Sequence, residues 1–195
     1  MKLLFATTNK GKLAELRHLM GPAAQVLSLA DFPGLAEPEE DADTFEGNAR
    51  KKALQYAKAT GVWTVADDSG LCVDALDGRP GVYSARYAPG DDRARYEKLL
   101  GELKDVPDER RGASFRCALC LASPAGETVV EVGELRGRIG HVPRGEHGFG
   151  YDPVFVVPEL GRTVAELSHE EKGRISHRGR AFEKMRPHLL ARMER

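Results

Sequence analysis

The chain has 195 residues, 41% hydrophobic and 30% charged, which predicts an ordinary globular protein of one domain with room for two lobes. Its 29 Lys and Arg nearly cancel its 30 Asp and Glu, which excludes a general electrostatic attraction to nucleic acid or an anionic membrane. No apolar run approaches the ~20 residues of a membrane span, and the N-terminus lacks the apolar run of a secretory signal, so we expect a cytoplasmic protein.

The first third of the chain predicts a strand, two helices and an acidic loop between the helices. In chain order these are the strand KLLFAT (2–7), the helix at 10–20, the loop at 31–43 and the helix at 44–61. The first helix places leucines at helical spacing and is followed by Gly21-Pro22, a natural stop. The acidic loop contains proline, which argues against regular structure there.

The middle of the chain predicts a second strand that ends in an acidic turn. The run VWTVAD (62–67) is typical of a strand, and the sequence DDSG begins at its last residue and reads as a turn. Residues 77–92 are rich in Gly and Pro and predict an ordered loop. A third helix is predicted over 91–106.

The last part of the chain predicts three strands and two helices. ASFRCALCLASP and ETVVEVGELRGRIG form an antiparallel pair, and a glycine-bearing loop at 147–158 enters the next strand. One short and one long helix follow. Cys117 and Cys120 have C-x-x-C spacing, but three positions along a strand face opposite sides, so we expect no metal or redox role. This succession of strands and helices predicts an α/β fold with a mixed sheet.

The segment TTNKGK (7–12) is the first candidate functional site. It joins a strand to a helix, where free N–H groups and the helix dipole favour an anion, and Lys10 and Lys12 add positive charge. The pattern differs from a P-loop, which needs glycine first and Lys-Ser/Thr last. Two interpretations remain open, a phosphate site and a capped helix with solvated lysines.

Acidic residues form the second candidate. They are Glu39, Glu40, Asp41 and Asp43 in the loop, and Asp67 and Asp68 at the strand end. Mg²⁺ binds one or two carboxylates together with substrate phosphates and water, so one acid from each segment could hold it. The loop considered alone is typical of a solvated surface, and Asp67 could simply cap the turn.

Two further segments complete the set of candidates. In HGFGYDPVF, Gly148 and Gly150 allow a close approach of backbone to a ligand and Phe149 offers a stacking face, although a glycine-rich turn with core aromatics fits equally. In SHEEKGRISHRGRAF, a basic cluster could hold the phosphates and base of a nucleotide or form a solvated helix end. The cluster comprises Lys172, Arg174, His177, Arg178 and Arg180.

Together these segments resemble the inosine/xanthosine triphosphate pyrophosphatase family, the Ham1-like house-cleaning nucleotidases. The matching motifs, in the expected order, are T-x-N-x-x-K (7–12), TFEGNARKKA, ADDSGLCVDALDGRPGVYSARYA, GFGYDP and ELSHEEKGRISHRG. The resemblance covers about residues 3 to 185. It implies a single Ham1-like domain over 1–195, with a mixed twisted sheet flanked by helices and two lobes with the active site in the cleft between them.

The resemblance also implies an activity and roles for individual residues. Members of the family use Mg²⁺ to hydrolyse ITP, dITP and XTP to the monophosphate and pyrophosphate, and a homodimer is expected. Asp68 would be the general base and a metal ligand, and Glu40 a second metal ligand. The triphosphate would be held by Thr7, Thr8, Asn9, Lys10, Gly11, Lys12 and Ser69, with Asn48 and Lys52 assisting. The base and sugar would be held by Phe149, Gly150, Tyr151, Asp152, Lys172, His177 and Arg178.

Three alternatives are weaker. The SHRG and GFGYDP segments favour the purine family over a Maf-type pyrophosphatase, which has a related fold and acts on modified pyrimidines or 7-methyl-GTP. A nucleotide sensor without hydrolysis need not keep the acids Asp68 and Glu40 together with Lys12. A nucleic-acid-binding module is disfavoured by the balanced charge and the absence of an interleaved aromatic and basic stripe.

Overall fold

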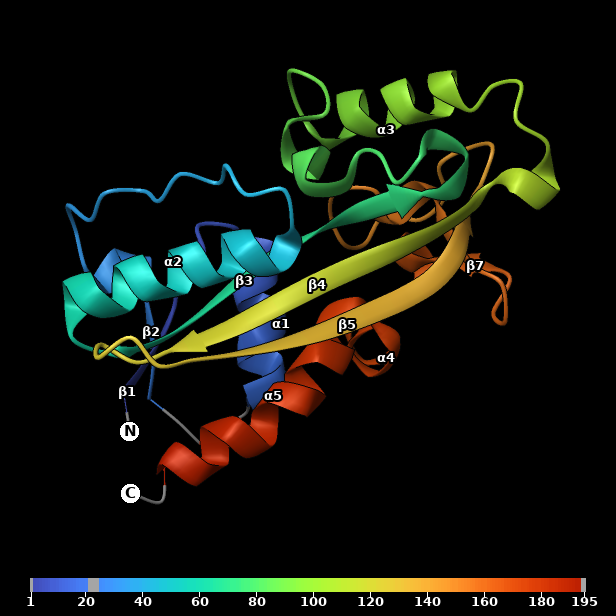
Figure 1. The fold of residues 1–195 in the computed structure, drawn as a ribbon. Helices are drawn as coiled ribbons and strands as arrows, with labels where there is room; N and C mark the ends of the chain where they lie inside the picture. Colours follow the sequence, from blue (N-terminus) through green and yellow to red (C-terminus); the bar gives the residue numbers. More distant parts are fainter. Residues whose placement is uncertain (1, 21–24, 194–195) are drawn as a thin grey trace. The chain divides into compact units, whose positions relative to one another are not determined.

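A computed structural model of the protein describes residues 2–20 and 25–193. A mixed seven-stranded sheet in the order β2-β1-β3-β4-β5-β6-β7 is flanked by helices, which confirms the predicted α/β class (Figure 1). The strands are β1 (Lys2–Phe5), β2 (Gln25–Ser28), β3 (Trp63–Val73), β4 (Gly112–Ala122), β5 (Thr128–Ile139), β6 (Phe155–Val157) and β7 (Arg162–Thr163). The helices are α1 (Lys10–Met20), α2 (Phe45–Thr60), α3 (Asp92–Glu102), α4 (His169–Ile175) and α5 (His177–Met193).

The sheet mixes parallel and antiparallel pairs. β1 pairs in parallel with β2 and with β3, whereas β6 pairs antiparallel with β5 and with β7. By its contacts the chain divides into two compact units. The first comprises Met1–Asp68, Cys117–Gly133 and His177–Arg195, and the second comprises Ser69–Arg116 and Glu134–Ser176. The predictions of a single domain and of an active-site cleft between two lobes stay predictions.

Most of the predicted elements are confirmed. Helix α1 has the predicted bounds, and the stop at Gly21-Pro22 lies outside the described residues. Helix α2 begins after Thr44, whose side chain accepts a hydrogen bond from the backbone N of Gly47 at 3.1 Å, and ends at Gly61 with a left-handed φ of 70°. The β4–β5 pair, the strand β6 and the two C-terminal helices also lie where they were expected.

The predicted strand end and acidic turn at DDSG are wrong. β3 runs without a break from Trp63 to Val73, through all four of these residues. Asp, Ser and Gly are individually unfavourable in strands, but that preference depends strongly on context. Here β3 lies between β1 and β4 in the sheet, and Leu71 and Val73 are fully buried in a hydrophobic core. The place of β3 in the sheet and the burial of its end therefore outweigh the local preference.

The short strands β2 and β7 were not predicted, and a six-residue 3₁₀ helix (Gly81–Arg86) lies within the predicted loop at 77–92. Cys117 and Cys120 are both buried on β4, and only Cys117 belongs to the core of the first unit, as expected for opposite faces. Burial raises the pKa of the Cys120 thiol to about 11, which makes it unreactive.

Over the described ranges 2–20 and 25–193, no helix has the length and apolar character needed to cross a membrane.

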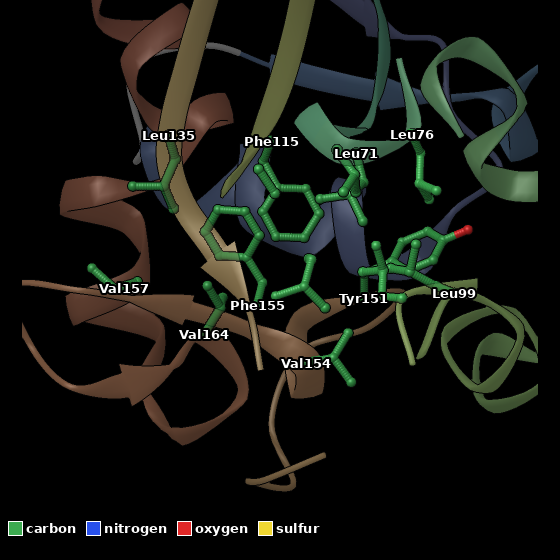
Figure 2. Close-up of a cluster of buried hydrophobic side chains, with 14 residues drawn as sticks. Leu71, Leu76, Leu99, Phe115, Leu135, Tyr151, Val154, Phe155, Val157 and Val164 are labelled. Carbon is green, nitrogen blue, oxygen red and sulfur yellow. The ribbon is translucent and has the colours of Figure 1, made fainter. Parts of the chain in front are cut away.

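Each unit has its own hydrophobic core. The core of the first unit gathers residues of β1, β3, β4 and α5: Leu3, Phe5, Val65, Cys117, Leu119, Leu121, Ala181, Phe182, Met185 and Leu189. In the second unit, the rings of Phe115 and Phe155 stack with centroids 4.4 Å apart (Figure 2). Tyr151 joins this second core and donates its hydroxyl to the backbone O of Ser84 at 2.8 Å, so its polar end is satisfied.

A buried arginine ties together the segments of the second unit. Arg111 is 1% exposed, and its guanidinium donates to four backbone carbonyl oxygens. Two of these, on Leu103 (2.6 Å) and Val106 (3.3 Å), follow the end of α3. The other two, on Ile139 and Gly140 (both 2.9 Å), lie at the end of β5. The planar guanidinium fits several fixed acceptors at once, which a lysine could not do.

We predict that Arg111→Met lowers the free energy of unfolding by about 3 kcal/mol, because it leaves several buried carbonyls without their donor. Urea denaturation measures the loss. The matched control is Arg110→Met, which changes an exposed neighbouring side chain and is expected to leave stability nearly unchanged. Equal losses in the two variants would contradict the anchoring role of Arg111.

Candidate functional site

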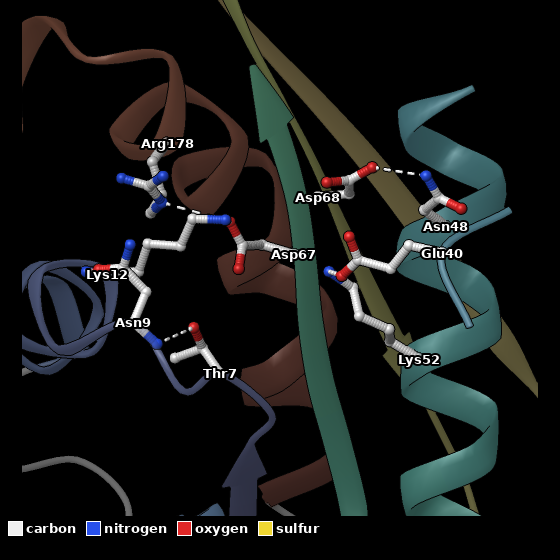
Figure 3. A network of polar contacts seen from close by, with 9 residues as sticks. All are labelled: Thr7, Asn9, Lys12, Glu40, Asn48, Lys52, Asp67, Asp68 and Arg178. Atoms are coloured by element: carbon white, nitrogen blue, oxygen red, sulfur yellow. Dashed lines mark hydrogen bonds and ion pairs between the residues drawn. The ribbon is translucent and has the colours of Figure 1, made fainter. Parts of the chain in front are cut away.

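The two adjacent aspartates lie in the middle of β3 and point to opposite faces of the strand (Figure 3). Both belong to the first unit, and both are nearly buried, with Asp67 2% and Asp68 6% exposed. Buried carboxylates are costly unless each has its own cations or donors. The alternation of the strand separates the two charges and gives each one a different set of partners.

Asp67 is the shared partner of two cations. Its Oδ2 lies 3.0 Å from Nζ of Lys12 and 3.6 Å from Nε of Arg178. These cations stand in the first turns of α1 and α5, where a positive charge opposes the helix dipole. Burial raises the pKa of Asp67, but Lys12, Arg178 and Lys52 outweigh it and hold that pKa well below its usual range. Asp67 is therefore ionised and fixes both cations, so the alternative that it caps a turn is wrong.

The segment between β1 and α1 caps the helix. Asn9 Oδ1 accepts a hydrogen bond from the backbone N of Lys12 at 3.1 Å, and Asn9 N donates to Thr7 Oγ1 at 3.2 Å. The capped-helix interpretation is thus correct for Asn9, whereas Lys12 is ion-paired rather than solvated. The other members of the segment are Thr8 and Lys10, which are exposed, and Gly11, which is half-buried. Phosphate binding by this segment stays a prediction.

Asn48 connects Asp68 to the acidic loop, of which Asp31 ends a short 3₁₀ helix (Leu29–Asp31) and the rest follows it. It is fully buried on α2, and its Nδ2 donates to Asp68 Oδ2 at 3.0 Å. Its Oδ1 accepts from the backbone N of Ala42 at 2.9 Å. Both ends of the amide are therefore used, which fixes its orientation and places the acidic loop beside Asp68.

Two more side chains of α2 hold the acidic loop. Lys52 Nζ donates to Glu40 Oε1 at 2.6 Å, and Gln55 Nε2 donates to the backbone O of Ala36 at 3.2 Å. Asn48, Lys52 and Gln55 are spaced at i, i+4 and i+7 and so line one face of the helix. Glu40 is consequently positioned by α2 and lies on the same side of β3 as Asp68 (Figure 3).

The charges around Asp68 shift two pKa values. Burial raises the pKa of Asp68; Lys52, Asn48 and Lys12 oppose this, Glu40 adds to it, and the net shift is upward. Burial lowers the pKa of Lys52, but the carboxylates around it outweigh burial and raise it. Lys52 is therefore charged, while Asp68 has a higher proton affinity than a solvated aspartate.

In the second unit, the predicted loop residues form a compact polar cluster. Asp152 is 4% exposed, and its Oδ2 accepts from Lys172 Nζ at 2.8 Å and from the backbone N of Phe149 at 2.9 Å. Lys172 Nζ also lies 4.5 Å from the centroid of the Phe149 ring, a cation–π distance. Gly148 has a φ of 81°, and a Cβ there would lie 2.1 Å from Asp152 Oδ2, so its lack of a side chain makes room for this carboxylate.

The remaining predicted site residues come from both units. Ser69 is half-buried on β3, Tyr151 is buried in the second core, and Gly150 has a left-handed φ of 64°. His177 is 7% exposed and is the first residue of α5. The predicted residues are thus divided between the units. Ser69, 149–152 and Lys172 belong to the second unit, and the rest belong to the first.

Sequence reasoning left the role of Asp67 open and missed the double role of Asn48. No short-range pattern links Asp67 to Arg178, because the two stand on different elements far apart in the chain. A signal was available in the β-type runs VWTVA before and LCV after DDSG, which one continuous strand would join through both acids. Followed to Val73, it would have placed Asp67 and Asp68 on opposite faces.

The sequence profile of the Ham1 family matches residues 3–188. The chain belongs to the Ham1 family. A dITP/XTP pyrophosphatase of Geobacter sulfurreducens is 53% identical over 191 residues, which cover 96% of each chain. The structure of the Staphylococcus aureus Ham1 protein has a TM-score of 0.88 at 40% identity and covers 98% of this chain and 100% of that one. A HAM1 protein from Coxiella burnetii has a TM-score of 0.89 at 39% identity, covering 98% and 99%.

Membership of the Ham1 family confirms the resemblance on which the residue roles were assigned, and favours it over the Maf-type alternative. The α/β fold is likewise that of solved Ham1 structures. The implied homodimer and the cytoplasmic location stay predictions.

We predict that Asp67→Asn lowers the free energy of unfolding by about 3 kcal/mol at pH 7, because it removes the anionic partner of a buried arginine. The loss is greatest above pH ~4, where aspartate of the unfolded chain is ionised. It shrinks as the pH falls through the lowered pKa of folded Asp67, because the wild type then loses the same charge.

Urea denaturation over a range of pH measures this difference. The control is Asp41→Asn, whose partner Lys51 and whose own carboxylate are both largely exposed, so we expect little change. A loss for Asp67→Asn that does not exceed the control, or that grows as the pH falls, would contradict the ion-pair assignment.

Proposed function

We propose that this chain hydrolyses the non-canonical purine nucleotides ITP, dITP and XTP to the monophosphate and pyrophosphate. One observation carries the proposal: Asp68 is held by Asn48 beside Glu40 and Lys52, in a chain of the Ham1 family. About half of its residues are identical to those of relatives named dITP/XTP pyrophosphatases. The activity would clear such nucleotides from the nucleotide pool.

Asp68 would accept the proton of the attacking water. Its net upward pKa shift supports this role, because a general base is more effective as its pKa approaches the working pH. The hydrogen bond from Asn48 occupies Oδ2 and fixes the direction of the carboxylate. Lys52 and Lys12 would place positive charge beside the departing pyrophosphate, which is how phosphoryl chemistry is commonly stabilised.

Asp68 and Glu40 have the chemistry of a Mg²⁺ site. Within residues 2–20 and 25–193, no group of three or more His, Cys, Asp or Glu side chains could hold a metal ion. A pair of carboxylates suits Mg²⁺, which is usually held by one or two carboxylates together with substrate phosphates and water. The upward effect of Glu40 on the pKa of Asp68 reflects a repulsion that a cation would relieve. When bound, Mg²⁺ would neutralise phosphate charge.

The base and sugar would be held by Phe149, Lys172, His177 and Arg178, with the Phe149 ring stacking on the purine. The cation–π contact between Lys172 and the Phe149 ring supports the stacking role, because it holds the ring beside Lys172. Hypoxanthine and xanthine carry an acceptor at O6, whereas adenine carries an amine there. Donors from His177 or Arg178 would therefore accept the first two bases and reject adenine, since a buried mismatch of donors is costly.

The first test is pyrophosphate release with Mg²⁺ from ITP, dITP, XTP, GTP, ATP and 7-methyl-GTP. We predict turnover of the first three and at least a ~100-fold lower kcat in Asp68→Asn, which removes the proton acceptor. Asp41→Asn removes an exposed carboxylate of the acidic loop and serves as the matched control with unchanged activity. Preference for 7-methyl-GTP would instead support a Maf-type activity. Tight ITP binding without turnover would support a sensor.

The metal is tested separately. We predict that a chelator abolishes pyrophosphate release and that added Mg²⁺ restores it. Glu40→Gln should raise the Mg²⁺ concentration needed for half-maximal activity about tenfold, because one hard anionic ligand is lost. Glu39→Gln, an exposed neighbour, is the control. An unchanged Mg²⁺ requirement in Glu40→Gln would remove Glu40 from the metal site.

A further inference from the structure

A carboxylate outside the predicted site residues holds the backbone of the loop at 148–152. The backbone N of Gly150 donates to Oδ2 of Asp92 at 2.7 Å, across 58 positions of the chain. Asp92 is the first residue of α3, and both partners belong to the second unit. This contact therefore links the rigid end of a helix to the loop that carries Phe149.

The carboxylate of Asp92 is itself fixed. Its other oxygen, Oδ1, accepts from Nη1 of Arg95, and Nη2 of the same guanidinium donates to the backbone O of Gly90 at 3.1 Å. Asp91 caps the helix, accepting at Oδ1 from the backbone N of Ala94 at 3.0 Å. Asp92 is thus an acceptor of defined direction on a capped helix, as a positioning group requires.

The loop has two independent anchors on successive amides. Phe149 N donates to Asp152, which is held by Lys172, whereas Gly150 N donates to Asp92. The first anchor lies within the predicted nucleotide-binding residues, and the second lies outside them. The amide N of Phe149 precedes the Cα of that residue, and the amide N of Gly150 follows it. Anchoring both amides fixes the backbone at Phe149 and so restricts the direction of its ring.

We propose that Asp92 is a positioning residue for nucleoside recognition: through Gly150 N it holds the Phe149 ring in the orientation that stacks on the purine. The inference rests on the proposed function, in which Phe149 binds the base. Asp92 acts through the loop alone, so it sets the affinity for the nucleoside part of the substrate. The triphosphate-binding residues Lys12 and Lys52 lie in the first unit and should be unaffected.

The variants are Asp92→Ala, which removes the acceptor, and Asp92→Asn, which keeps an acceptor oxygen but loses the ion pair with Arg95. Asp91→Asn is the matched control. It removes the adjacent charge from the same helix end, and asparagine caps helices as well as aspartate does. Any effect of helix capping or of net charge at this end of α3 therefore appears in the control as well.

We expect Asp92→Ala to raise the KM for XTP about fivefold, since a lost hydrogen bond is worth about 1 kcal/mol. The kcat should stay within about twofold of wild type, a margin that corresponds to one weak contact. The inhibition constant of pyrophosphate should stay within the same margin, because pyrophosphate has no base for Phe149 to bind. Asp92→Asn should fall between Asp92→Ala and wild type, and Asp91→Asn should match wild type. A fall in kcat, or equally weakened pyrophosphate inhibition, would overturn the positioning role.

Hydrogen exchange of the amides at 149–152 provides a readout that needs no activity. Exchange should be faster in Asp92→Ala than in wild type and Asp91→Asn, because Gly150 N loses its acceptor. Unchanged exchange would overturn the anchor. If wild type neither hydrolyses XTP nor binds XMP, the proposed function fails. If wild type is active and KM is the same in all variants, only the inference about Asp92 fails.

Discussion

The alternation of side chains along β3 is the constraint on which the candidate site depends. Two adjacent carboxylates cannot share one buried environment without a large electrostatic cost. A strand sends them to opposite faces, so each face must supply its own positive charges or donors. One face receives Lys12 and Arg178, and the other receives Asn48 and Lys52 beside Glu40. A turn at this position would have left both acids in one solvated place.

This constraint explains which polar side chains the helices of the first unit present to β3. α1 and α5 each place a cation in the first turn, against the helix dipole, and Asp67 offsets that cost. α2 contributes a fully buried amide that is satisfied at both ends. The three helices therefore meet β3 through charges and donors, and α1 and α5 also pack on the core of the first unit. The geometry around Asp68 follows from how these helices are held.

The sequence predicted the elements with strong local patterns and missed those decided by partners. Helical spacing and the Thr44 and Gly61 boundaries were enough to predict α2. The two-residue β7 and the four-residue β2 are too short to show a period, and the middle of β3 has turn-like residues that sheet pairing overrides. For the site, residue types and motifs indicated the region of Asp68. The bond from Asp92 to Gly150 joins segments that no local pattern connects.

The tethering of the acidic loop by one face of α2 has a consequence for sequence variation. Glu40 owes its position to Lys52, and the neighbouring backbone is held by Asn48 and Gln55. The position of the Glu40 carboxylate is thus set by contacts with α2 rather than by the loop's own conformation. Glu37 and Glu39 are exposed loop residues outside this set of tethering contacts. The sequence can therefore vary at these two positions while the Glu40 carboxylate keeps its place beside Asp68.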